Sequence, residues 1–400
     1  MVGDVLFGSG NATLTVDKGT VAGAVAFGSG ANNTLSIAPG ASVTGGLSNT
    51  GGLNTTVNGQ LSVTSATAVP MTSFASGADS TVGFTADQQG AGVGSFQVAN
   101  AATLGAGTKI QLGFKSKLSV AAASPFALQD LVLIHANGGL VNNGYDADLS
   151  GDLPFIYTGA LRNTANDLVV SVRRRTAAEL GLQGAKAAAF DAFYEVFDKD
   201  PLVASQVFGQ TSASGFDGLY SQFLPDYGGG PFHAVAEASR AVSRAQSEEP
   251  TSLQSGPRSW LQEIAFGVDH SSNTGQVVYD SAGFGLAGGV ENPGPGNSTV
   301  GYSVAFATSD VENSNRAFGS NLTASTLMGS LYWRKALHGI VFDASGTGGY
   351  AWFNSKRRVI SNNLAGQQVL ARDADADWSG AMASVRFGAS YEAQFGKVYV

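Results

Sequence analysis

Large apolar residues alternate with small residues along the last third of the chain. In residues 298–310, STVGYSVAFATSD, every second residue from Val300 to Phe306 is large and apolar, and the residues between them are glycine, serine or alanine. Successive side chains of a strand point to opposite faces. A soluble sheet usually sets an apolar face against a charged or large polar one, so this run does not fit the usual arrangement.

The same alternation recurs within the stretches 260–269, 283–291, 323–335, 338–353 and 381–395. Runs of about 9–11 residues span a bilayer when the strands are tilted, with apolar residues outward and small or polar residues inward. The pattern therefore predicts transmembrane strands, with Trp260 and Ile264 outward in the first of them. The positions predicted to face lipid are Val300, Tyr302, Val304, Phe306, Leu331 and Trp333. The positions predicted to face a wet lumen are Glu263, Arg334, Arg386 and Glu392.

The lengths of the links between these strands favour one orientation. Short links are expected at 292–297 and 335–339, and long links at 309–321 and 354–377. Outer-membrane barrels have short periplasmic turns and longer outer loops, so the first strand is predicted to run outward. The acidic run Asp373, Asp375, Asp377 lacks the glycine of a calcium loop and is interpreted as a solvated loop.

The first third of the chain contains a repeat of roughly 20 residues. Residues 7–25 align with 27–47, so that Phe7 matches Phe27 and Leu14 matches Leu35, and residues 55–63 form a weaker third copy. Short strands of this period with Gly and Asn turns predict a parallel β-solenoid. Its turns lack the carboxylates of a calcium-binding repeat. His135, in the strand run 128–136, is interpreted as a structural residue.

The middle of the chain is predicted to be helical. The run 176–200 has apolar residues at helical spacing, with Thr176 as its N-cap, and shorter helical pieces follow. A slim helix is predicted at 231–246, where Glu237, Arg240 and Arg244 form one charged stripe. Taken alone, such a stripe is typical of a solvated surface.

Composition excludes several kinds of site. Charged residues make up 13% of the chain and the net charge is −8, which argues against nucleic-acid binding. With no cysteine there is no disulfide and no thiolate metal site. The acids of the first third are widely spread, so no catalytic residue, cofactor site or metal site is predicted. No apolar run reaches the length of a transmembrane helix, and the N-terminus does not read as a signal peptide.

The order solenoid, helices, slim helix and barrel resembles the bacterial autotransporters of type V secretion. The residues that carry the resemblance are NDLVVSVRRRTAAELGL (166–182), AAAFDAFYEVFDKD (187–200), LYSQFLPDYGGGPFHAVAEASRAV (219–242) and RSWLQEIAFGVD (258–269). The resemblance implies a mainly β chain in three parts. These are a passenger β-solenoid with its junction region at 1–175, a helical linker at 176–257 that includes the pore helix 231–246, and the N-terminal part of an outer-membrane barrel at 258–400.

The resemblance also implies a function. The barrel would sit in outer-membrane lipid, inserted by the barrel-assembly machinery with periplasmic chaperones, and would translocate and anchor a passenger at the cell surface. The pore helix would plug the barrel, with Glu237, Arg240 and Arg244 facing the lumen charges. Since about six or seven of the family's twelve strands are visible, we expect a fragment of a longer precursor. The alternative is a secreted or surface solenoid adhesin, or a polysaccharide-acting enzyme, with a soluble β-sandwich at 260–400.

Overall fold

The computed structural model describes residues 1–88, 92–118, 127–224, 229–248, 256–270, 279–296, 298–313, 321–337, 340–362, 367–391, 394–395 and 398–399. The chain is mainly β, with 57% strand and 15% helix, which confirms the predicted fold class. It divides into two compact units, Met1–Leu224 and Pro225–Val400. Each unit is described by itself.

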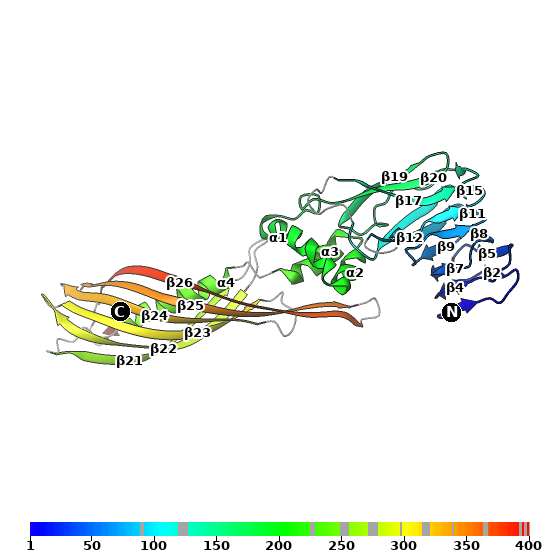
Figure 1. Cartoon of the computed structure of the whole chain (residues 1–400). Helices are drawn as coiled ribbons and strands as arrows, with labels where there is room; N and C mark the ends of the chain where they lie inside the picture. The colour runs from blue at the N-terminus through cyan, green and yellow to red at the C-terminus, as the bar shows by residue number, and fades with distance from the viewer. Residues whose placement is uncertain are drawn as a thin grey trace. The chain divides into compact units, whose positions relative to one another are not determined.

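The first unit stacks short strands into parallel sheets (Figure 1). One sheet contains β2 (Thr13–Val16), β5 (Asn33–Ile37), β8 (Leu53–Val57), β11 (Ser73–Ser76), β15 (Ala102–Leu104) and β18 (Leu140–Asn142). A second contains β3 (Gly19–Ala22), β6 (Ala41–Gly45), β9 (Gln60–Val63), β12 (Thr81–Asp87) and β16 (Lys109–Phe114), with β13 (Gly92–Val93) antiparallel to β12. The third side starts with β1 (Val5–Leu6), β4 (Val25–Ala26) and β7 (Leu47–Ser48), and continues in a separate sheet of β10 (Val69–Met71), β14 (Phe96–Val98), β17 (Gln129–Ala136), β20 (Asp167–Arg174) and β19 (Tyr157–Asn163).

The register confirms the repeat read from the sequence. Leu14 pairs with Leu35, and Ile37 pairs with Val57 on the next rung. The rings of Phe7 and Phe27 stack with centroids 5.7 Å apart. Leu35 and Ile37 are completely buried, so each rung contributes to one continuous apolar core.

His135 lies in β17 opposite Asp167 in β20, where the strand pairing has become antiparallel. Its Nδ1–H donates to Asp167 Oδ1 at 2.6 Å, and its Nε2 lies 3.2 Å from Asn137 Oδ1. The carboxylate of Asp167 raises the pKa of the His135 imidazole. His135 therefore pairs two strands, in agreement with its interpretation as a structural residue.

The helices of the first unit begin later than predicted. They are α1 (Gly184–Glu195), a 3₁₀ turn (Val196–Asp198), α2 (Pro201–Phe208) and α3 (Ala213–Phe223). Thr176 and Glu179 do form a reciprocal cap, with the Glu179 carboxylate accepting from the Thr176 N–H at 2.8 Å, but it closes a single turn. Gly181 and Gly184 have φ of 73° and 54°, which interrupts the helix.

Aromatic rings join these helices to the end of the solenoid. Tyr157 of β19 approaches Tyr194 of α1 with the two hydroxyls 3.1 Å apart. The buried Arg174 guanidinium lies 4.7 Å from the Tyr194 ring centre and pairs with Asp191 at 2.6 Å. Since α1 to α3 belong to the first unit and the next helix to the second, the predicted linker 176–257 is divided between the two units.

The second unit is an antiparallel sheet with a helix on one face (Figure 1). Its strands follow in chain order: β21 (Arg258–His270), β22 (Tyr279–Gly294), β23 (Ser298–Asn313), β24 (Asn321–Leu337), β25 (Ile340–Asn362) and β26 (Gln368–Tyr391). The helix is α4 (Gly230–Glu248), and β27 (Gln394–Phe395) pairs with β28 (Val398–Tyr399). In the described residues the sheet is open, with β21 and β26 at its edges.

The links alternate in length as the sequence suggested, but one long loop was wrongly placed. Links 295–297 and 338–339 are shorter than 271–278, 314–320 and 363–367. Most of the predicted loop 354–377 instead lies in β25 and β26. There the acidic residues face basic or polar partners across the hairpin, with Asp375 opposite Lys356 and Asp373 opposite Arg358. These opposite charges favour pairing over an open loop.

Candidate membrane-spanning sheet and pore helix

The face of the sheet turned away from α4 is apolar and exposed. Leu331 is 70% exposed, Val304 58% and Trp333 37%. Val300, Tyr302 and Phe306 also lie on this face, so it holds all six positions predicted to face lipid. In water so large an apolar surface would be unfavourable, whereas hydrocarbon would solvate it.

The opposite face is built from small residues and packs against α4. Ser303, Ala305 and Ala307 of β23 are buried there. The helix contributes Ala238, Ala241, Val242 and Ala245 to the same cluster. Small side chains on both surfaces let the helix approach the strands closely, and hydroxyls and amides bridge the remaining gaps. Gln246 Nε2 donates to Ser303 Oγ at 2.8 Å, and the Ser239 and Ser384 hydroxyls are 2.7 Å apart.

A buried polar network joins side chains of β21, β22 and β24 on this inner face. The Arg334 guanidinium of β24 forms an ion pair with Glu291 of β22, and both side chains are almost fully buried. The Tyr332 hydroxyl donates to Glu291 at 3.0 Å and accepts from the Trp260 indole N–H at 2.7 Å. Arg258 adds a longer contact to Glu291 at 3.2 Å. The charges of Arg334 and Glu291 are thus balanced within the sheet, as buried charges require.

The direction of α4 is fixed by what each of its ends touches. Near its N-terminus, Ala234 packs with Tyr279, Val311 and Leu322, at the ends of strands joined by the longer links. Toward its C-terminus, Gln246 reaches Ser303, nearer the short link 295–297. The chain therefore enters the sheet from the side of the longer links and ends α4 near the side of the shorter ones.

Residues 259–400 match the family model of the autotransporter beta-domain. This part of the chain is an autotransporter beta-domain. The match confirms the family resemblance read from the sequence, and it identifies an outer-membrane element with a role in translocation. No curated protein and no solved structure matches the chain.

No helix within the described ranges is long and apolar enough to cross a membrane. The same residues contain no group of three or more His, Cys, Asp or Glu side chains that could hold a metal ion.

The first strand of the beta-domain faces opposite to the prediction. Trp260 and Ile264 are buried against α4, whereas Leu261 is 77% exposed and Glu263 lies on the same exposed face. The prediction for Glu263 is therefore wrong. The inner face beside α4 is itself apolar there, and the small residues of α4 leave room for large side chains. Large apolar residues at every second position of β21 therefore did not reveal which face of the strand meets lipid.

The charged stripe of α4 does not hold the helix to the beta-domain in the way predicted. Arg240 forms its ion pair with Glu237 on the helix itself. Arg240, Arg244 and Arg386 line a groove of about 770 Å³ between α4 and β26. Among the described residues no ion pair joins Arg240 or Arg244 to the strands.

The remaining predicted lumen positions have different outcomes. Arg334 is buried on the inner face, but its partner is Glu291 rather than a residue of α4. Glu392 lies outside the described residues. Sequence reasoning did not single out Glu291 as a site residue. The alternation along the strand could have indicated its position, because Glu291 lies on the same face as most of the glycines of that strand.

Proposed function

We propose that the beta-domain anchors residues 1–224 at the bacterial cell surface as the membrane-proximal part of a passenger. The observation that supports this is the direction of α4, which enters the inner face of the sheet from the side of the longer links. Longer links mark the outer side of such sheets. The chain that precedes α4 would then lie outside the cell.

Lipid, rather than a protein partner, would cover the outer face of the beta-domain. The exposed residues of this face run across β21 to β26, and large apolar side chains dominate it. We propose that the barrel-assembly machinery inserts the strands and that periplasmic chaperones keep the chain unfolded beforehand, as the family implies. An exposed apolar sheet needs such protection because its unpaired edges aggregate readily.

The proposed role of this segment is structural and includes no catalysis. In the solenoid, His135 pairs with Asp167, and Asp130 pairs with Arg162 at 2.6 Å. The first pair joins the adjacent strands β17 and β20, and the second joins β17 to β19 across β20. Such pairs hold strands of one sheet together, whereas catalysis needs acids and bases that converge on a cavity.

Cysteine labelling tests the proposed orientation, because the chain contains no native cysteine. We would place single cysteines at Thr56, on the exposed solenoid surface, and at Pro295, in a short link of the sheet. A membrane-impermeant maleimide should label Thr56→Cys on intact cells. It should label Pro295→Cys only after the outer membrane is permeabilised. Equal labelling of both variants on intact cells, or protection of Thr56→Cys, would contradict the orientation.

A further inference from the structure

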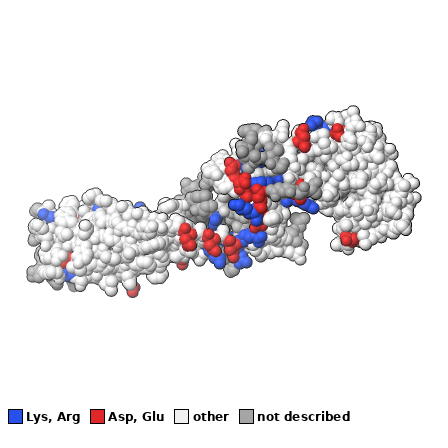
Figure 2. Space-filling view, in the orientation of Figure 1, with Lys and Arg blue, Asp and Glu red and all other residues white. Residues whose placement is uncertain are grey.

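The solenoid presents a long surface without charge. No Asp, Glu, Lys or Arg occurs between Gly19 and Ala78, and Figure 2 shows the region of the solenoid strands mostly white. Hydroxyls and amides supply the outward polarity instead. The Thr20 and Ser42 hydroxyls lie 2.8 Å apart on neighbouring rungs, and Gln60 Nε2 donates to Ser62 Oγ at 3.2 Å. Such a surface offers an anionic ligand no ion pair.

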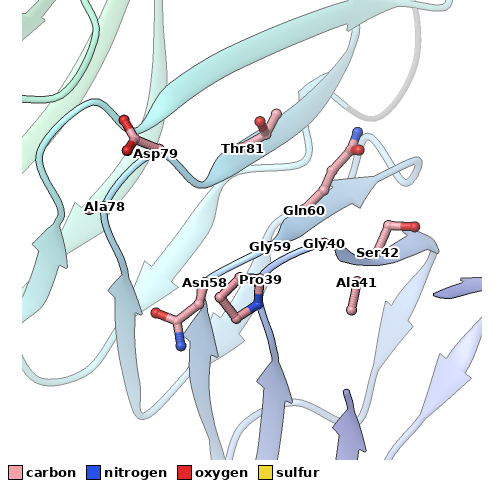
Figure 3. Close-up of a pocket in the computed structure, with 10 residues that line it drawn as sticks. All are labelled: Pro39, Gly40, Ala41, Ser42, Asn58, Gly59, Gln60, Ala78, Asp79 and Thr81. Carbon is pink, nitrogen blue, oxygen red and sulfur yellow. The ribbon is translucent and has the colours of Figure 1, made fainter. Parts of the chain in front are cut away.

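A notch interrupts this surface where one turn is shorter than its neighbours. Only Asn58 and Gly59 separate β8 from β9. Residues 38–40 separate β5 from β6 on one side, and residues 77–80 separate β11 from β12 on the other. The short turn recedes between the two longer ones and leaves a groove of about 690 Å³ (Figure 3). This is within the volume range of small-molecule sites.

The floor of the notch is held rigidly by the stacked rungs. The Asn58 N–H donates to the Ile37 carbonyl at 2.8 Å, and the Thr81 N–H donates to the Gly59 carbonyl at 2.9 Å. A Cβ on Gly59 would lie 2.2 Å from the Ala41 carbonyl oxygen, so only glycine fits there. The notch is therefore formed before any ligand arrives.

Five of the ten residues that line the notch have polar side chains. Asn58 and Asp79 are exposed, and within the described part of the chain neither side chain forms a hydrogen bond. Figure 3 shows Asn58 and Gln60 at one turn and Asp79 at the next. Together with the hydroxyls of Ser42 and Thr81 they offer both donors and acceptors. The lining contains no cation and no aromatic ring.

We propose that this notch binds a neutral saccharide. Sugar hydroxyls donate and accept at once, which matches a mixed lining of amides, hydroxyls and one carboxylate. The Asp79 carboxylate can accept from a hydroxyl and would repel an acidic sugar. Without an aromatic platform, affinity would come from hydrogen bonds alone and would be weak for a single site. This inference adds ligand recognition to the proposed surface role.

The test uses the full chain in micelles of a detergent without a sugar headgroup, so that the detergent does not compete. The probes are the neutral hexasaccharides of glucose, mannose and N-acetylglucosamine, with a hyaluronan hexasaccharide as the acidic comparison. Saturation-transfer NMR should detect binding of a neutral probe and little binding of the acidic one. Since the assay does not depend on membrane orientation, its failure is distinguishable from failure of the translocation proposal.

Three variants locate the binding. Asn58→Ala and Asp79→Asn should each weaken it by about 3- to 10-fold, the usual effect of one lost hydrogen-bonding group. Asn tolerates the positive φ of 55° at position 79, so the second variant keeps the turn. Thr56→Ala, on a strand outside the notch, should leave binding unchanged, and circular dichroism would verify folding. No binding of any neutral probe, preference for hyaluronan, or equal binding by all three variants would overturn the proposal.

Discussion

The two β regions of this chain sort similar residues in opposite directions. In the solenoid, Leu35 and Ile37 point inward and are completely buried, while Thr34 and Ser36 point outward. In the beta-domain, Phe306 points outward and is 50% exposed, while Ser303 is buried beside α4. The comparison shows that the alternation of large and small residues predicts a strand in both regions. Which face is covered by protein depends on whether the strand encloses its own core or meets a second apolar medium.

The two regions also differ in where they place charged residues. The solenoid rungs between residues 19 and 78 contain no charged residue. The beta-domain instead buries Arg334 and Glu291 on its inner face. A solenoid interior has no place for such a pair, whereas a face that lines a lumen does.

Removing one partner of the buried ion pair should have the largest effect. Arg334→Met leaves the Glu291 carboxylate without its main counter-charge, and we expect a loss of about 3–5 kcal/mol in the free energy of unfolding. Urea unfolding in lipid vesicles, followed by tryptophan fluorescence, would measure it. All four tryptophans lie between residues 260 and 378, so the signal reports on the beta-domain.

The matched control is the double variant Arg334→Met/Glu291→Gln. It removes both charges and keeps an acceptor for the Tyr332 hydroxyl, so most of the lost stability should return. If the single variant were as stable as the natural chain, the inner face would be wet enough to solvate the lone carboxylate.

Two leucines test the inversion directly. Leu35→Ala opens a cavity in the solenoid core and should lower the free energy of unfolding of that unit by about 2–5 kcal/mol. Leu331→Ala changes a side chain that is 70% exposed, and we expect a loss of less than about 1 kcal/mol. Hydrogen exchange of the backbone amides of β5 and β24 would follow the two units separately. Equal losses at the two positions would contradict the inverted sorting.

Acid–base titration gives a smaller effect, confined to the solenoid. Because Asp167 raises the pKa of His135, the pair contributes stability that is fully present below the unfolded pKa of about 6.5. This contribution is lost as the pH rises through the higher folded pKa. Exchange of the imidazole C2 hydrogen, read by mass spectrometry, should show the raised pKa. Asp167→Asn should lower it toward 6.5, whereas Asp130→Asn, which removes a different pair, should not.

The sequence predicted where strands and helices lie better than it predicted which face of a strand is covered by protein. Pairing of Leu14 with Leu35 followed from the repeat, because identical rungs stack in register. The face of β21 did not follow, because Trp260 and Ile264 are apolar whether they meet lipid or the apolar surface of α4. Glu291 and Arg334 are 43 positions apart, and only the register across β22, β23 and β24 brings them together. The start of α1 depends on the positive φ angles of Gly181 and Gly184, which the spacing of apolar residues does not reveal.

The smallest effect is expected at a second ion pair, which is a counterpart to the buried one. Arg358 Nε of β25 lies 3.9 Å from Asp373 Oδ1 of β26, and both side chains are nearly half exposed. Water screens such a pair, so a double-mutant cycle with Arg358→Gln and Asp373→Asn should give a coupling of at most about 0.5 kcal/mol. It should weaken further in high salt, whereas the coupling of Arg334 with Glu291 should not. A large coupling at Arg358 that resists salt would show that this end of the hairpin is also shielded from water, and the contrast between inner charges and outer charges would then disappear.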